Sequence, residues 1–198
     1  MSLPLSDSHA GHSLASEEMM DKKMLRRQLL AVRKAIPEDL KKQYDHALCL
    51  RIKSWLEESA VKTISVYLPI RNEPDLMELY ETLSGKVQMA LPYVPAKDSP
   101  LQFIAWQPGD ELVEGAFHIP VPKAMEQVPM PEVLIIPCVG YTADRYRLGY
   151  GGGFFDRTLE GQGNILTVGV AYSSLKTAFQ TEKFDIPLSI IITEAGIE

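Results

Sequence analysis

A glycine-rich run in the C-terminal half of the chain has the residue types best suited to hold an anion. It reads Arg147-Leu-Gly-Tyr-Gly-Gly-Gly-Phe-Phe-Asp-Arg157, after a buried-type apolar segment at 133–136 and before a helix start. Glycine lets backbone N–H groups turn toward a ligand, a helix N-terminus favours negative charge, and arginine adds charge-assisted hydrogen bonds. The run predicts a phosphate-binding loop, the alternative being a surface turn that binds nothing.

Two familiar phosphate loops are excluded by the spacing. No Gly-Lys-Ser/Thr follows the run, so it is not a Walker loop. The dinucleotide fingerprint requires a glycine five residues after Gly149, where this chain has Phe154. The loop therefore holds its ligand by another scheme.

Basic residues crowd the first predicted helix, with no acid between Lys22 and Lys34. A solvated basic face is the ordinary interpretation of such a run, and the sequence alone favours it. However, Lys22, Arg26 and Arg33 share one stripe of the helix. In an acidic protein, that stripe would also serve to direct several cations at one polyphosphate.

Four further side chains are candidates for binding, and each has a structural alternative. Glu73 directly follows a predicted strand and is either an acid near a helix N-terminus or a ligand contact. Asp156 is either a ligand of the metal that accompanies a nucleotide or a plain acid in the first turn of a helix. Asp185 has the setting of a turn residue, and neither aspartate alone indicates a metal. Trp106 is either a core residue or a ring that stacks on a planar ligand. The sequence offers no Ser/His/Asp or Cys/His grouping for covalent catalysis.

Composition excludes several classes of protein. The chain has 198 residues and a net charge of −6, which argues against a general nucleic-acid binder. No apolar run reaches the length of a membrane span, and no secretory signal is evident. Cys49 and Cys138 lack metal-type spacing and are expected to be buried thiols in a reducing compartment. We therefore expect a cytoplasmic protein that does not bind membranes.

Strand-type and helix-type segments alternate along the chain. Ser16 is expected to begin a helix with an apolar stripe of Leu25, Leu29, Val32 and Ile36, and Pro37 to lie in the first turn of a second helix. A short helix should run from Pro74 to near Gly85. Strands are predicted at 63–68, 87–91, 101–106, 117–119, 133–136, 165–171 and 189–193.

This alternation predicts an α/β fold, a three-layer α/β/α arrangement with a mixed, largely parallel sheet. Residues 1–16 are expected to form a disordered arm and residues 17–198 a single domain. Ligand sites in such sheets lie at the carboxyl ends of the strands. Glu73 and the glycine-rich run both follow strands, so we expect them to meet there.

Taken in order, these motifs resemble the 5-formyltetrahydrofolate cyclo-ligase (5,10-methenyltetrahydrofolate synthetase) family. The similarity extends from about Lys22 to Glu194. The glycine-rich run, from Arg147 to Asp156, matches the family signature Arg-Leu-Gly-x-Gly-x-Gly-x-x-Asp. The other landmarks are Lys22-x-x-Leu25-Arg26, Tyr67-Leu-Pro-Ile-Arg-Asn-Glu73, Trp106-Gln-Pro-Gly-Asp110 and Phe184-Asp185.

The resemblance implies an ATP- and Mg²⁺-dependent cyclisation of 5-formyltetrahydrofolate to 5,10-methenyltetrahydrofolate, with release of ADP and phosphate. It implies a monomer or small homo-oligomer that acts on ATP and a reduced folate. It assigns Mg²⁺ to Asp156 and Asp185, and the folate to Leu68, Glu73 and Trp106. The ATP contacts it implies are Lys22, Lys23, Met24, Leu25, Arg26, Arg147, Leu148, Gly149, Tyr150, Gly151, Gly152, Gly153, Phe154 and Phe155.

Three departures from the family pattern keep alternatives open. Phe155 replaces the tyrosine that precedes the metal aspartate, and Arg145 replaces a glycine. A family glutamate is also missing from the segment His118-Ile-Pro-Val-Pro122. The alternatives are a divergent, non-catalytic nucleotide- or folate-binding protein and a sugar-phosphate isomerase on a similar scaffold.

Overall fold

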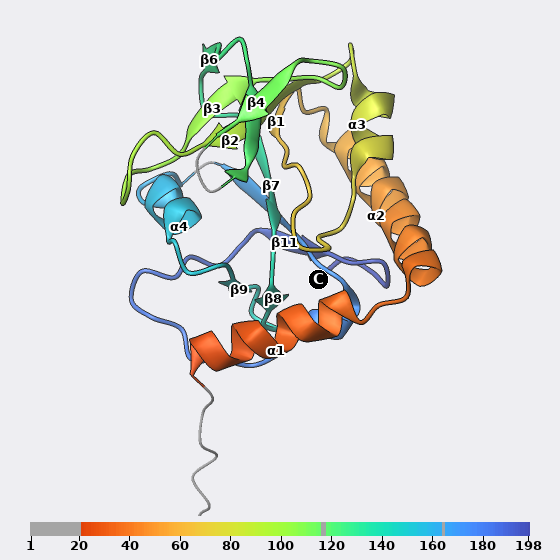
Figure 1. The fold of residues 1–198 in the computed structure, drawn as a ribbon, viewed down its shortest axis with the longest axis vertical. Helices are drawn as coiled ribbons and strands as arrows, with labels where there is room; N and C mark the ends of the chain where they lie inside the picture. Colours follow the sequence, from red (N-terminus) through yellow and green to blue (C-terminus); the bar gives the residue numbers. More distant parts are fainter. Residues whose placement is uncertain (1–20, 116–117, 164) are drawn as a thin grey trace, which may run out of the picture.

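The computed structural model describes residues 21–115, 118–163 and 165–198 (Figure 1). Four α-helices occur in these ranges, together with a short 3-10 helix, η2. The helices are α1 (Lys22–Lys34), α2 (Glu38–Ser59), α3 (Met77–Leu83), α4 (Phe154–Leu159) and η2 (Ser173–Leu175). The strands are β1 (Thr63–Ser65), β2 (Gln88–Tyr93), β3 (Gln102–Ala105), β4 (Leu112–Glu114), β5 (Pro120–Pro122), β6 (Gln127–Val128), β7 (Val133–Pro137), β8 (Gly140–Tyr141), β9 (Arg147–Leu148), β10 (Leu166–Val170) and β11 (Ile190–Ile192).

A seven-stranded sheet forms the centre of the fold, in the order β11-β10-β7-β1-β2-β3-β6. The neighbours from β11 to β2 pair in parallel. The last two pairs, β2 with β3 and β3 with β6, are antiparallel. The predicted mixed, largely parallel sheet is thus confirmed.

The sheet buries apolar side chains on both faces, as alternation along β7 shows. Val133 and Ile135 belong to the core that includes residues of α1, α2 and α3. Leu134 and Ile136 belong to the opposite core, together with Leu159 of α4. Since successive strand residues point to opposite faces, one strand serves both cores. The result is three layers, with α2 and α3 on one side of the strands and the short α4 on the other (Figure 1).

A small hairpin that the sequence did not predict links the sheet to the glycine-rich run. β8 and β9 pair antiparallel after β7, and the run leaves β9 and enters α4. Gly140 in β8 lets α1 approach closely, because a Cβ there would lie 2.5 Å from Leu29 Cδ1. Helix α1 therefore packs at the edge of the sheet where β7 ends.

Helix α1 differs from its prediction in two ways. It begins at Lys22, with the Asp21 side chain accepting a hydrogen bond from the Lys23 amide, whereas the expected start at Ser16 lies outside the described residues. Leu25 and Leu29 are buried as predicted, but Val32 is 45% exposed and Arg33 is fully buried in its place. The reason is that Arg33 finds hydrogen-bond acceptors inside the molecule.

Smaller differences concern proline and strand ends. The strand predicted at 117–119 is instead β5, which begins at Pro120 and pairs with β4, and Phe117 lies outside the described residues. β1 ends at Ser65 rather than at Leu68, just ahead of Pro69. Pro37 caps α2 rather than lying in its first turn. The expected arm at 1–16 lies outside the described ranges, and within those ranges no helix is long and apolar enough to cross a membrane.

The two apolar residues of α1 provide a matched test of this packing. We expect Leu29→Ala to lower the free energy of unfolding by about 2–4 kcal/mol, because it opens a cavity under a buried side chain. Val32→Ala on the same helix should change it by less than about 0.5 kcal/mol, because Val32 is largely exposed. Urea unfolding followed by circular dichroism measures both. Equal losses of unfolding free energy in the two variants would show that Leu29 and Val32 are both buried, as the sequence predicted.

Candidate functional site

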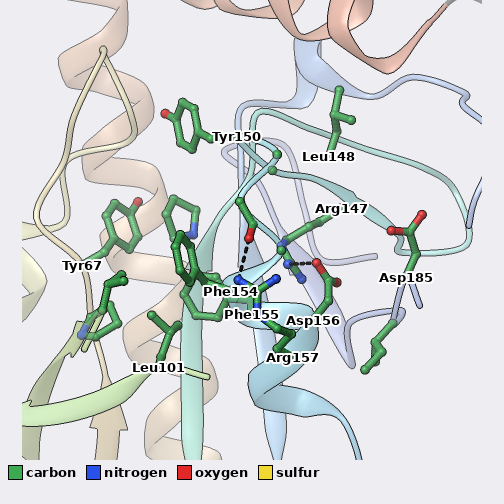
Figure 2. Close-up of a pocket in the computed structure, with 18 of the residues that line it drawn as sticks. Tyr67, Leu101, Arg147, Leu148, Tyr150, Phe154, Phe155, Asp156, Arg157 and Asp185 are labelled. Atoms are coloured by element: carbon green, nitrogen blue, oxygen red, sulfur yellow. Dashed lines mark hydrogen bonds and ion pairs between the residues drawn. The ribbon is translucent and has the colours of Figure 1, made fainter. Parts of the chain in front are cut away.

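An open cleft of about 1290 Å³ lies where α1, the segment after β1, the glycine-rich run, α4 and segment 182–186 converge (Figure 2). Glu73 and the glycine-rich run both line this cleft. The Tyr150 hydroxyl of the run donates a 2.7 Å hydrogen bond to Glu73 Oε1. The expectation that these two features meet beyond the strand ends is confirmed.

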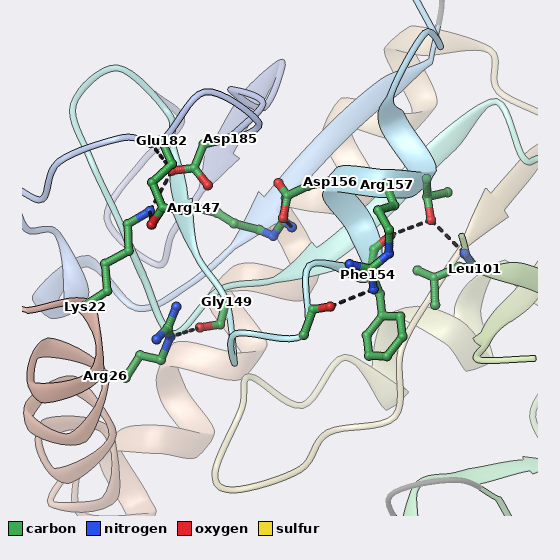
Figure 3. Close-up of polar contacts among 12 residues, drawn as sticks. Lys22, Arg26, Leu101, Arg147, Gly149, Phe154, Asp156, Arg157, Glu182 and Asp185 are labelled. Atoms are coloured by element: carbon green, nitrogen blue, oxygen red, sulfur yellow. Dashed lines mark hydrogen bonds and ion pairs between the residues drawn. The ribbon is translucent and has the colours of Figure 1, made fainter. Parts of the chain in front are cut away.

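Backbone conformation and two arginines hold the glycine-rich run in place. Gly151 has φ +95°, a conformation that side-chain-bearing residues rarely adopt, and a Cβ there would lie 3.4 Å from Arg26 Cζ. Arg26 Nε donates to the Gly149 carbonyl at 2.7 Å (Figure 3). Arg157 Nη2 donates to the Gly152 carbonyl at 2.7 Å. Cations from both sides thus reach the run and border the space beside its amides.

Lys22 lines the cleft and makes two ion pairs there. Its Nζ lies 2.7 Å from Asp185 Oδ2 and 2.9 Å from Glu182 Oε1 (Figure 3). Burial works to lower the pKa of Lys22, but its hydrogen bonds to these two carboxylates outweigh burial and raise it. For Asp185, burial works to raise the pKa, but the hydrogen bonds from Lys22 and the Glu182 amide hold it below its usual range. Both groups are charged at neutral pH.

Arg147 presents an unsatisfied donor at the cleft. Its side chain is only 6% exposed and pairs with Asp156, with Nη2 2.9 Å from Oδ2. Its Nη1 is buried and has no hydrogen-bond partner among the described residues. The guanidinium lies over the Phe155 ring, 5.3 Å from the centroid. Because a buried unpaired donor is destabilising, a site with this geometry favours an anionic ligand.

The two aspartates form a sparse donor set for a cation. Asp156 and Asp185 each use Oδ2 for a basic partner, while Oδ1 of each makes no hydrogen bond to any described residue. Within the described ranges, no three His, Cys, Asp or Glu side chains gather as a metal cluster. Mg²⁺ suits such a pair, because it usually takes one or two carboxylates and completes its shell with water and phosphate oxygens.

Glu73 is an almost fully buried carboxylate, 2% exposed, on a tight turn. Its amide bonds back to the Ile70 carbonyl at 2.9 Å, across Arg71 and Asn72, which both have positive φ. The Ile70 amide donates to Glu73 Oε2 at 2.9 Å. Burial raises the pKa of Glu73, and the hydrogen bonds from Ile70 and Tyr150 oppose the shift. A strained turn thus holds a buried acceptor at the cleft.

Most of the predicted site residues line the cleft, although their roles stay predictions. Four do not. Lys23 and Met24 are exposed, and Leu25 is a core residue. Trp106 is 4% exposed and packs edge-on against Tyr80 at 5.9 Å, which fits the core alternative. The residues that line the cleft are Lys22, Arg26, Leu68, Glu73, Arg147, Leu148, Gly149, Tyr150, Gly151, Gly152, Gly153, Phe154, Phe155, Asp156 and Asp185.

Sequence reasoning missed two contributors to the site and misplaced a third residue. Glu182 pairs with Lys22, and no local pattern marks it. Arg157 was noted only as the end of the run, although its charge was a usable signal. Arg33 was expected on the stripe of cations directed at polyphosphate, but it is buried and does not line the cleft.

Comparisons with known proteins agree on one family. The model of the 5-formyltetrahydrofolate cyclo-ligase family matches residues 18–194. The 5-formyltetrahydrofolate cyclo-ligase of Escherichia coli is 30% identical over 175 residues, which cover 83% of this chain and 96% of that protein. The Mycoplasma pneumoniae cyclo-ligase is 30% identical over 179 residues, which cover 88% and 99%.

Solved structures agree as well. The Aquifex aeolicus 5,10-methenyltetrahydrofolate synthetase superposes with a TM-score of 0.77 at 29% identity, covering 90% of this chain and 92% of that one. The Mycoplasma pneumoniae 5,10-methenyltetrahydrofolate synthetase gives a TM-score of 0.74 at 28% identity, covering 88% and 99%. The fold and the sequence thus point to the same relatives.

The buried Glu73 carboxylate predicts a pH-dependent stability difference. Its pKa is raised in the folded protein, so it destabilises the fold above that pKa and has no such effect below the unfolded value. Relative to wild type, Glu73→Gln should therefore gain thermal stability as the pH rises from about 4 to 7. Melting curves over this range test it, with the exposed Glu81→Gln as control. A Glu73→Gln difference that is flat with pH would contradict the account.

Proposed function

The chain belongs to the 5-formyltetrahydrofolate cyclo-ligase family, and from this membership we propose that it converts 5-formyltetrahydrofolate to 5,10-methenyltetrahydrofolate with ATP. The observation that carries the proposal is the single cleft lined by both the glycine-rich run and Glu73. The cleft brings cations and backbone amides together with a buried carboxylate. A reaction between a polyphosphate and a pterin requires both kinds of site side by side.

ATP lies between α1 and the glycine-rich run in this proposal. Lys22, Arg26 and Arg147 supply positive charge, and the amides at Gly149–Gly153 hold phosphate oxygens. Support comes from the unpaired Nη1 of Arg147, which gains an acceptor when phosphate binds. Asp156 and Asp185 would hold Mg²⁺, which neutralises phosphate charge and orients the terminal phosphoryl group.

The pterin of the folate lies on the Glu73 side. A carboxylate can accept two parallel N–H hydrogen bonds from a guanidine-like edge, and such charge-assisted bonds are strong. Leu68 and Tyr67, the latter shown in Figure 2, also line the cleft and add apolar surface to it. A ligand held there lies beside the glycine-rich run, because Tyr150 of the run contacts Glu73.

The chemistry depends on position and charge rather than on a nucleophilic side chain. The N5-formyl oxygen attacks the γ-phosphorus of ATP, and ADP leaves. N10 then attacks the phosphorylated imine carbon, phosphate departs with the formyl oxygen, and loss of the N10 proton gives the methenyl bridge. Juxtaposition of the reactants and neutralisation of phosphate charge lower the barrier.

The compartment and oligomeric state predicted from the sequence stay predictions.

The test is direct. Protein, ATP, Mg²⁺ and 5-formyltetrahydrofolate are mixed, and the methenyl chromophore is followed together with phosphate release. Equal amounts of methenyl product and phosphate are expected. ATP hydrolysis without methenyl product indicates another acceptor substrate. Binding of ATP or folate without turnover favours the non-catalytic binding protein.

Arg26 supplies a specific prediction for ATP affinity. Arg26→Ala should weaken ATP·Mg²⁺ binding about tenfold or more, because a charged hydrogen bond contributes about 1.5–3 kcal/mol. Combining it with Gly151→Val should weaken binding further, because a β-branched residue is strained at φ +95°. Calorimetry measures both, with the exposed Arg27→Ala as a control from the same helix. Unchanged affinity in the double variant would refute this location for ATP.

Phe155 supplies a prediction for rate. If a hydroxyl at this position orients phosphate or substrate, Phe155→Tyr should raise turnover several-fold to about tenfold, because a net hydrogen bond contributes about 0.5–1.5 kcal/mol. The ring already lies against Arg147 at the cleft. Steady-state kinetics and a melting curve check it together. Unchanged or reduced turnover in a well-folded variant would mean that the missing hydroxyl does not limit the rate.

A further inference from the structure

Arg33 is an arginine of α1 that is wholly buried yet does not line the cleft. Its guanidinium reaches three segments that are distant in sequence. Nε donates to the Arg71 carbonyl at 3.0 Å, and Nη1 donates to the Cys138 carbonyl at 3.4 Å. Nη2 donates to the Tyr150 hydroxyl at 2.6 Å. One side chain therefore joins α1, the turn that carries Glu73, the end of β7 and the glycine-rich run.

The contact with Tyr150 continues to Glu73. Tyr150 accepts a hydrogen bond from Arg33 and donates its own proton to Glu73 Oε1 at 2.7 Å. Burial and the nearby Glu73 raise the pKa of Tyr150, so its hydroxyl remains a donor at neutral pH. The ring is also held from its face, with Arg71 Cζ 5.2 Å from the centroid. The Tyr150 hydroxyl thus bridges the Arg33 guanidinium and the Glu73 carboxylate.

Stability alone does not account for this arrangement. Arg33 makes no direct ion pair with any carboxylate among the described residues. Placing a cation in the interior is unfavourable unless it is paired, and well-packed apolar side chains often do as well or better. Two of the three hydrogen bonds of Arg33 go to residues that line the cleft, to the Tyr150 hydroxyl and to the Arg71 carbonyl in the turn before Glu73.

We propose that Arg33 is a positioning residue for folate binding, which holds the Tyr150 hydroxyl and the Glu73 carboxylate as one unit facing the substrate. The inference rests on the proposed function, because it takes Glu73 to be the folate contact. Arg33 touches no substrate and acts through Tyr150 and through the Arg71 carbonyl. The strained Arg71–Asn72 turn keeps the conformation that places Glu73, because Arg33 donates a hydrogen bond to the Arg71 carbonyl.

The positive charge of Arg33 also affects the protonation of Glu73. Burial raises the pKa of Glu73, while Arg33 and Arg71 are the nearby cations that lower it. The other titratable groups that interact with Glu73 are neutral near pH 7, namely Tyr67 beyond β1, Tyr80 of α3, Cys138 beyond β7 and Tyr150. Removing the charge of Arg33 therefore raises the pKa of Glu73 further. The protonated carboxyl group is then a poorer acceptor for the pterin.

A double-mutant cycle tests the bridge. We expect Arg33→Lys and Tyr150→Phe each to raise the folate KM about tenfold or more, with smaller changes in kcat and in the KM for ATP. The double variant should resemble the more impaired single variant, because both changes break the same path. Arg27→Lys, an exposed arginine on the same helix, should behave as wild type. Circular dichroism and melting curves check that each variant is folded.

The pH profile separates positioning from mere structural damage. In wild type, we expect the folate KM to rise as the pH falls through the pKa of Glu73. In Arg33→Gln, which removes the charge but keeps an amide donor, this rise should begin at higher pH. In Arg33→Lys, which keeps the charge, it should begin at the wild-type pH, although the KM is higher at every pH. If Arg33→Gln does not fold, the cycle with Arg33→Lys and Tyr150→Phe decides the proposal.

The outcomes are distinct. Suppose that the wild type is active. If the two single changes then multiply in the double variant, or if the folate KM is unchanged in folded Arg33→Lys and Tyr150→Phe, the role of Arg33 is overturned and the proposed function stands. A rise in ATP KM alone places Arg33 with the nucleotide and likewise overturns it. A wild type that neither binds nor converts 5-formyltetrahydrofolate overturns the proposed function itself.

Discussion

The close packing of α1 against the carboxyl edge of the sheet is the constraint on which the whole site depends. α1 carries Lys22 and Arg26 to the cleft, and two contacts fix its position. Leu29 approaches β8 over a glycine, where a Cβ would come within 2.5 Å. Arg33 penetrates between the segments that follow β1, β7 and β9. A shift of α1 would therefore displace Lys22 and Arg26 and disturb the turn that carries Glu73 at the same time.

The site keeps polar groups in states that are unfavourable for the folded protein alone. Glu73 is a buried carboxylate on a turn with two consecutive residues at positive φ, and Arg147 has a buried N–H group without a partner among the described residues. Both features raise the free energy of the folded protein, and ligands that supplied a donor and an acceptor would relieve them. Both groups are thereby held in fixed positions at the cleft, so they need not reorient when a ligand binds or reacts there.

The sequence predicted the α/β class, the parallel strands and the meeting of Glu73 with the glycine-rich run, because hydrophobic periodicity and strand order carry that information. It did not predict the β8–β9 hairpin, whose two-residue strands are too short to show a period. It expected Val32 rather than Arg33 to be buried, because the acceptors that satisfy Arg33 are supplied by distant segments. Trp106 was undecided from sequence because core and stacking positions favour the same residue type.

Amide hydrogen exchange tests the central claim, that one cleft binds ATP at the glycine-rich run and folate at Glu73. Exchange would be measured on the free protein, with ATP and Mg²⁺, and with 5-formyltetrahydrofolate. The account predicts that ATP with Mg²⁺ slows exchange at 149–153 and that the folate slows exchange at 67–73. Ligand protection that spares both segments while appearing elsewhere in the fold would contradict the account.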